Sequence, residues 1–161
     1  KAYICGLGYY ELYLNGEKVG DHVLDPAPSN YDKQAYYVSY DITEDIRMWV
    51  LSQLVSDGLL TLHIQHTSAS LLINENYDSD VLVDLESFFA RLVVDGDSHF
   101  IHTTEGPDDM PAHIRTALTQ TSLSIPVKDK RALLGQWQGI FIYEHRYGEF
   151  NRRVNLHLIG E

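Results

Sequence analysis

The order of apolar and polar positions predicts a β-rich opening to the chain. Apolar residues flank Asn15-Gly16, a pair that readily adopts the positive φ values of a type I′ turn, so 11–23 is expected to form a hairpin. The proline-containing stretch 25–32 predicts a loop. Residues 35–40 are rich in Tyr and Val, which is typical of a strand.

Apolar spacing then predicts three helices. The first begins at Asp41 or Thr43, either of which can cap it, and ends at 56–58. The second covers 80–92, and the third covers 108–118 with a cap at Asp108 or Asp109 and Pro111 in its first turn. The apolar positions expected to face the core are Ile46, Trp49, Val50 and Leu54 in the first helix, and Val81, Leu85, Phe88 and Leu92 in the second, where Leu82 and Phe89 widen the stripe.

Alternating apolar and polar residues predict strands around these helices. They cover 59–66, 69–73, 122–127, 139–145 and 152–159, and the last two are expected to form a hairpin around 147–149. Helices and strands alternate early and strands cluster late. The fold class predicted is therefore α+β, a single domain with a mainly antiparallel sheet or sandwich and two or three helices.

Charge and composition narrow the partners that the chain can have. Its 161 residues carry 12 Lys and Arg against 23 Asp and Glu, a net charge of −11. A field of that sign repels phosphate backbones and anionic membrane surfaces, so neither nucleic acid nor a membrane is an expected partner. No apolar run approaches the roughly 18 residues of a membrane helix. The single cysteine, Cys5, excludes an intrachain disulfide framework and fits a reducing, cytoplasmic setting.

Several short motifs follow one another in 41–161. They are His66-Thr67-Ser68-Ala69-Ser70, Asn74-Glu75-Asn76, Asp84-Leu85-Glu86, His102, 106–113, Leu134-Gly135, Trp137-Gln138-Gly139 and Glu144-His145-Arg146. In this order and spacing they resemble the YjbQ family, sometimes described as secondary thiamine-phosphate synthases. The departures from the family pattern are Ser79 in place of a common Pro, Lys130 in place of a frequent turn Gly, and Gln136 in place of a usual Thr.

Residues 1–40 resemble something else, a fragment of the N-terminal β-sandwich of bacterial α-L-rhamnosidases. The likeness lies in 4–20 and in Leu24-Asp25-Pro26. The piece is too short for the whole sandwich, so we expect it to pack into the same domain as 41–161. We hypothesise an artificial or recombinant chimera joined near 40–43. A natural fusion is the weaker alternative because neither parent fold would be whole.

The YjbQ resemblance implies a homotrimer and a site for a small phosphorylated ligand, with weak thiamine-phosphate synthase activity. Three histidines at motif positions, His66, His102 and His113, are the candidate ligands of a divalent metal, zinc or magnesium. Three protein ligands and one open position are what a catalytic metal needs. The candidate catalytic residues are Glu75, Asp109, Glu144 and Arg146. The candidate substrate-binding residues are Ser68, Asn74, Asn76 and Gln138.

Other interpretations of these residues stay open at this point. The histidines can instead cap turns, and Glu75 or Glu144 can be an ion-pair partner of Arg146 or Arg115. Whether the chain is an enzyme is not decided by the sequence. A structural or engineered protein without a selected function is one alternative. A carbohydrate-binding module, suggested by the tyrosines of the first forty residues, is another.

Overall fold

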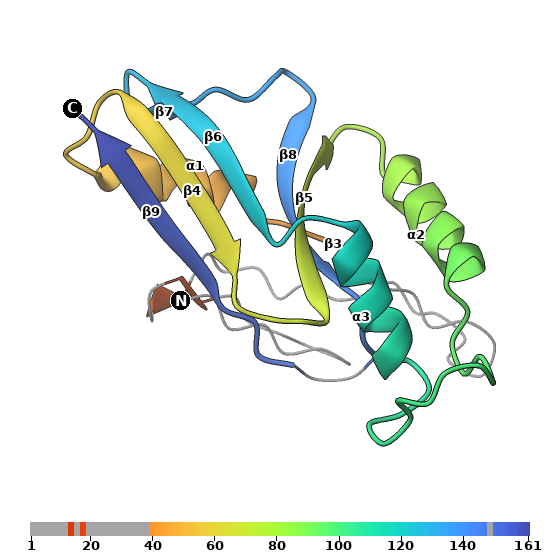
Figure 1. Cartoon of the computed structure of the whole chain (residues 1–161). Helices are drawn as coiled ribbons and strands as arrows, with labels where there is room; N and C mark the ends of the chain where they lie inside the picture. Colours follow the sequence, from red (N-terminus) through yellow and green to blue (C-terminus); the bar gives the residue numbers. More distant parts are fainter. Residues whose placement is uncertain (1–12, 15–16, 19–38, 148–149) are drawn as a thin grey trace.

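The computed structural model describes residues 13–14, 17–18, 39–147 and 150–161, and its strands form antiparallel sheets. The two larger sheets have the orders β3-β8-β5 and β7-β6-β4-β9 (Figure 1), and β1 and β2 form a separate pair. Three helices accompany these sheets in the described part of the chain, which confirms the predicted α+β class. None of these helices is long and apolar enough to cross a membrane.

The elements run in the following order. The first part holds β1 (Tyr13–Leu14), β2 (Glu17–Lys18), β3 (Ser39–Asp41), α1 (Thr43–Ser52), β4 (Gly58–Ile64) and β5 (Ala69–Glu75). The second part holds α2 (Asp80–Leu92), α3 (Asp109–Leu118), β6 (Ser122–Lys128), β7 (Arg131–Ala132), β8 (Gln138–Glu144) and β9 (Val154–Gly160).

The core lies between the two sheets and under α1. Strands with one face inward alternate in burial, and β6 shows this pattern at every position. The helix α1 closes the core through Ile46 and Val50, which are fully buried. The sheets contribute Leu60, Leu62, Ile64, Ala69, Leu71, Leu123, Ile125, Val127, Ile140, Ile142 and Val154.

The opening hairpin is confirmed where the structure describes it. The strand β1 pairs with β2, and Tyr13 lies opposite Lys18. The predicted strand 35–40 is described at 39–40, where β3 pairs with β8. The predicted loop 25–32, Cys5 and the rest of the rhamnosidase-like segment lie outside the described residues.

Two predictions about the helices are wrong. The helix α1 ends at Ser52, and Leu54 lies beyond it with 97% of its surface exposed. In α2 the predicted core stripe is wrong at Phe88 and Leu92, which are about half exposed, whereas Val81 and Leu85 are partly buried and Phe89 is buried. The residues that turn inward are Glu86 and Phe89, and Phe89 packs edge-on against Tyr143 with ring centroids 5.9 Å apart.

The predicted hairpin of the last two long strands is also wrong. The strand β8 lies between β3 and β5, whereas β9 pairs with β4 in the other sheet. The chain therefore changes sheets between 144 and 154. This crossing brings Glu144 and Arg152 together, and it positions one of the polar networks described below.

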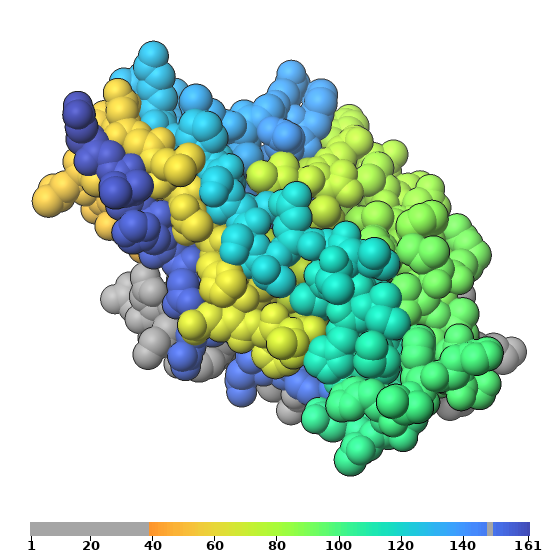
Figure 2. Space-filling model, in the orientation of Figure 1, coloured from red at the N-terminus to blue at the C-terminus, as the bar shows by residue number. Residues whose placement is uncertain are grey.

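The polar residues around α3 lie at one end of the molecule. The helix α3 and the connection that precedes it lie at the end of the sheets where β5 begins (Figure 1). Figure 2 shows α2, α3 and this connection together at one end of the visible face, with β9, β4 and β6 side by side at the other. Asp108 is the N-cap of α3, as predicted, but its side chain makes no capping hydrogen bond and instead accepts from Arg146 and Tyr147.

Candidate metal centre

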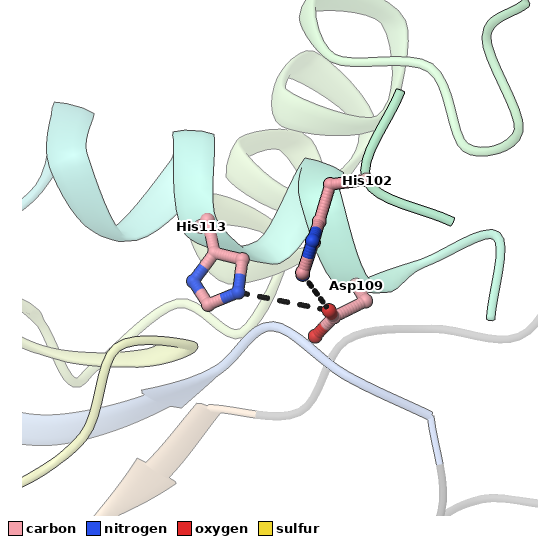
Figure 3. Close-up of side chains that lie close together, drawn as sticks. All are labelled: His102, Asp109 and His113. Atoms are coloured by element: carbon pink, nitrogen blue, oxygen red, sulfur yellow. Dashed lines mark ion pairs between the residues drawn. The ribbon is translucent and has the colours of Figure 1, made fainter. Parts of the chain in front are cut away.

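Two histidines and one aspartate direct their polar atoms at a common point beside α3 (Figure 3). Asp109 and His113 are four residues apart on this helix, so both lie on one face of it. His102 comes from the connection that precedes the helix. One ligand atom from each of the three residues lies within 4.8 Å of the other two.

The carboxylate of Asp109 lies at the centre of this cluster. Its Oδ2 is 2.8 Å from His102 Nε2 and 3.7 Å from His113 Nε2. This oxygen is buried, yet among the described residues no donor is aligned well enough to form a hydrogen bond with it. A buried carboxylate oxygen without a proper donor is costly unless a cation completes its surroundings.

The tautomer of His113 follows from its other contact. Its Nδ1 lies 3.0 Å from the carbonyl oxygen of Thr67. A carbonyl can only accept, so Nδ1 carries a proton, and Nε2 is the ring nitrogen that faces Asp109. Metal-binding histidines are oriented by this kind of backbone contact.

Arg146 holds Asp109 and its neighbour Asp108 in place. Its Nη1 donates to Asp109 Oδ1, and its Nε donates to Asp108 Oδ2 at 3.0 Å. A third contact runs from Nη2 to the carbonyl oxygen of Glu105 at 2.7 Å. Arg146 thus neutralises one edge of the two carboxylates and leaves Asp109 Oδ2 for the histidines.

His66 lies in a neighbouring network and not in the three-residue cluster. Arg152 Nη1 is 2.7 Å from His66 Nε2, and since an arginine can only donate, this nitrogen is the acceptor. The opposite nitrogen, Nδ1, is 3.0 Å from Ser68 Oγ. Burial, followed by the charge of Arg152, lowers the pKa of His66, so the ring is neutral at pH 7.

Glu144 is the ion-pair partner of Arg152, and neither Arg146 nor Arg115 fills this role. Both carboxylate oxygens of Glu144 accept from Arg152, at 2.5 Å each. The backbone N–H groups of 145 and 146 add two more donors at 3.0 Å. A carboxylate that accepts from this many donors suits a structural ion pair better than a proton donor.

The remaining predicted residues lie at the opposite end of β5 and β8. Glu75 is opposite Gln138 in the register, while Ala69 is opposite Glu144. Seven residues of strand separate the two ends by about 20 Å. Asn74, Asn76 and Gln138 also lie at the Glu75 end, and Gln138 accepts from the Gly135 N–H at 2.7 Å.

Two residues important for these networks were missing from the predicted set. Asp108 was predicted only as a cap of the helix, because sequence spacing does not reveal that it pairs with Arg146. Arg152 is 1% exposed and joins Glu144, His66 and Ser68. The signal in the sequence was an arginine directly before an apolar strand, where a buried charge requires a buried partner.

A hollow of about 410 Å³ opens beside His102. Its wall combines the apolar side chains of Phe100, Pro107 and Met110 with the polar side chains of Asp97, Ser98 and Thr103. His102 belongs both to this wall and to the three-residue cluster. A small organic molecule in the hollow would therefore lie next to an ion held by the cluster.

Comparison with known proteins places most of the chain in one family. Residues 30–161 match the family model described as UPF0047 protein YjbQ-like. The match begins before residue 41, where the resemblance was expected to start. A UPF0047 protein of Synechocystis is 54% identical over 107 residues, 66% of this chain and 73% of the relative. A crystal structure of an uncharacterized YjbQ/UPF0047 protein from Clostridium acetobutylicum has a TM-score of 0.70 at 29% identity, covering 79% of this chain and 95% of that one.

A second match has a different origin. An α-L-rhamnosidase of Formosa agariphila is 85% identical over 46 residues, which are 29% of this chain and 5% of the rhamnosidase. An identity this high over so small a share of the enzyme identifies a fragment. The match is consistent with the predicted chimera.

Proposed function

This chain belongs to the YjbQ-like UPF0047 family, and we propose that His102, Asp109 and His113 bind one divalent metal ion at the centre of its chemistry. The observation that carries the proposal is the buried Oδ2 of Asp109, which faces two imidazole nitrogens and has no aligned hydrogen-bond donor. Two imidazoles and one carboxylate favour zinc or a similar transition ion over magnesium, which prefers oxygen ligands.

The geometry fits such an ion after small side-chain movements that widen one separation and shorten the others. Ligand atoms around a tetrahedral zinc lie about 3.3 Å apart. Here Asp109 Oδ2 and His102 Nε2 are 2.8 Å apart, and the widest separation in the group is below 4.8 Å. His102 and His113 are partly exposed, with ring centroids 5.5 Å apart, so side-chain rotation can close the remaining distance.

Metal content of the purified protein tests this proposal. Protein prepared without chelator is expected to carry about one ion per chain. His113→Ala and His102→Ala should lose it, whereas His99→Ala, in an exposed side chain outside the cluster, should keep it. Metal-free wild-type protein that also binds no added zinc in calorimetry would refute the site. His66→Ala adds a separate arm, in which retained metal is expected because His66 contacts Arg152 and Ser68.

We further propose that the site supports a weak transferase activity of the thiamine-phosphate synthase type, as the family resemblance implies. That reaction joins an aminopyrimidine diphosphate to a thiazole phosphate and releases pyrophosphate. A bound divalent ion would neutralise the charge of the departing pyrophosphate. The chain's own part is to hold the ligands through Arg146 and Thr67 and to receive the organic portion in the hollow beside His102.

The activity can be measured independently of metal binding. Thiamine phosphate and pyrophosphate are quantified with both substrates, for wild-type protein, His113→Ala and His99→Ala. We expect His113→Ala to lose at least about tenfold in rate and His99→Ala to match the wild type. A wild-type protein that binds metal but forms no product above the uncatalysed rate would remove this activity and leave the metal site standing.

We also propose the homotrimer that the resemblance implies. It is supported by apolar side chains exposed on the outer face of α2, namely Val83, Phe88 and Leu92. Sedimentation should give a trimer for the wild type and for Met48→Glu, an exposed position on α1. Phe88→Glu should shift the protein toward monomer because it places a charge in an apolar contact. A wild-type monomer at all concentrations would contradict the trimer.

A further inference from the structure

A second hollow, of about 180 Å³, lies outside the three-residue cluster. Among the described residues its wall is formed by Gln65, Asn151, Arg152 and Arg153, none of which carries a carboxylate. It lies just past the end of the β4–β9 ladder, whose last pair is Ile64 with Val154. There the backbone N–H of Gln65 donates to the carbonyl of Arg153 at 2.9 Å, which ties the two sides of the hollow together.

Arg152 is fixed at the base of this hollow. Its Nε and Nη2 donate to Glu144, Nη2 also reaches Ser68 Oγ at 3.3 Å, and Nη1 reaches His66 Nε2. Its guanidinium also lies over the Phe150 ring, 4.6 Å from the centroid. Each nitrogen Nη carries two hydrogens, so the second N–H of Nη1 has no partner within the described residues.

Arg153 supplies an uncompensated charge. Its side chain is exposed and forms no salt bridge with the residues that the structure describes. Glu144 balances Arg152, and His66 is neutral, so Arg153 leaves the hollow with a net positive charge. The chain as a whole has a net charge of −11, so a positively charged hollow is a local exception that attracts anions.

We propose that this hollow binds a phosphate group, either as inorganic phosphate or as the phosphoryl group of a small ester. Guanidinium groups and amide N–H groups are the donors that match tetrahedral oxyanions, and Arg153 can contribute its fork in a bidentate manner. Gln65 and Asn151 add neutral donors from opposite sides. A carboxylate has fewer oxygens for the same set of donors. The inference stands on these residues and does not require a metal ion in the cluster.

Calorimetric titration with inorganic phosphate tests the proposal. The wild-type protein is treated with EDTA, dialysed and titrated at constant ionic strength. Arg153→Gln is expected to weaken phosphate binding about tenfold, the loss of one charge-assisted contact. Arg131→Gln is the matched control, since it removes an exposed arginine of the same charge on β7 and should change the affinity by less than about twofold.

Four outcomes would each overturn the phosphate site. The first is the absence of saturable binding in the metal-free wild type. The second is an equal loss in Arg153→Gln and Arg131→Gln, which would show a general charge effect. The third is binding that requires zinc and disappears in His113→Ala, which would assign phosphate to the metal cluster. The fourth is tighter binding of acetate than of phosphate.

Discussion

The buried carboxyl of Glu86 makes the stability of this protein depend on pH in a calculable way. Glu86 lies on the inner face of α2 and is 9% exposed. Burial raises its pKa from 4.5 to about 8. The folded state therefore retains a proton that the unfolded state releases between these values, and the free energy of unfolding falls as the pH rises from about 4.5 to 8.

The perturbation is Glu86→Gln, which keeps the shape and removes the titration. From the two pKa values, the ionisable side chain costs the folded state about 1 kcal/mol at pH 5, about 3 at pH 7 and about 5 at pH 9. The variant should be more stable than the wild type by a margin that grows in this order.

Urea unfolding at pH 5, 7 and 9, at one protein concentration, measures the three differences. Asp84→Asn on the exposed face of the same helix is the control, and its difference from the wild type should not change with pH by more than a few tenths of a kcal/mol. A difference for Glu86→Gln that stays flat from pH 5 to 9 would refute the reasoning, because it would mean that Glu86 is charged in the folded protein throughout.

Three further substitutions have defined outcomes in thermal or urea unfolding at pH 7. Ser79→Pro should stabilise the protein by about 0.5–1 kcal/mol, because Ser79 already has a φ of −63° before α2; a loss of stability would show that its N–H is needed. Lys130→Gly should add about 1 kcal/mol, because Lys130 has a φ of 58° in the turn between β6 and β7, and an unchanged melting temperature would contradict this. Ser70→Ala should cost about 1–3 kcal/mol, because it removes the 2.9 Å contact to the fully buried ring of His145; a neutral result would mean that this hydrogen bond contributes nothing.

The predictable part of the fold is the part that local pattern controls. The alternation in 59–66 and 122–127 and the apolar spacing in 80–92 gave the right elements, since one face of each must be buried. The pairing of β8 was not predictable in this way. A short connection favours a hairpin, yet β8 joins β3 and β5 because their apolar faces complete a different side of the core. Local spacing contains no information about which sheet a strand joins.

The exposure of Phe88 and Leu92 on α2 was not predicted, for a related reason. Apolar spacing says that a face is covered, but not by what, and Phe88 and Leu92 are half exposed within one chain. The inward face instead carries Glu86, a residue that pattern analysis assigns to solvent. Both departures have the same physical cause, namely that α2 packs on the sheet mainly through Phe89, with Leu85 beside it, against Tyr143 of β8.

The register of β5 and β8 decides how the candidate site can work. The order of the motifs along the sequence suggested a single site. Antiparallel pairing instead places Ala69 beside Glu144 at one end of the β5–β8 ladder and Glu75 beside Gln138 at the other end. The end of the ladder near Glu144 carries the three-residue cluster and the arginines. The other end, about 20 Å away, carries three amides and a carboxylate. Within one chain these groups cannot touch the same small molecule. If Glu75 takes part in the chemistry of His102 and His113, a neighbouring copy must bring it there, and in that case dissociating the protein with Phe88→Glu should abolish activity while leaving the metal content of each chain unchanged.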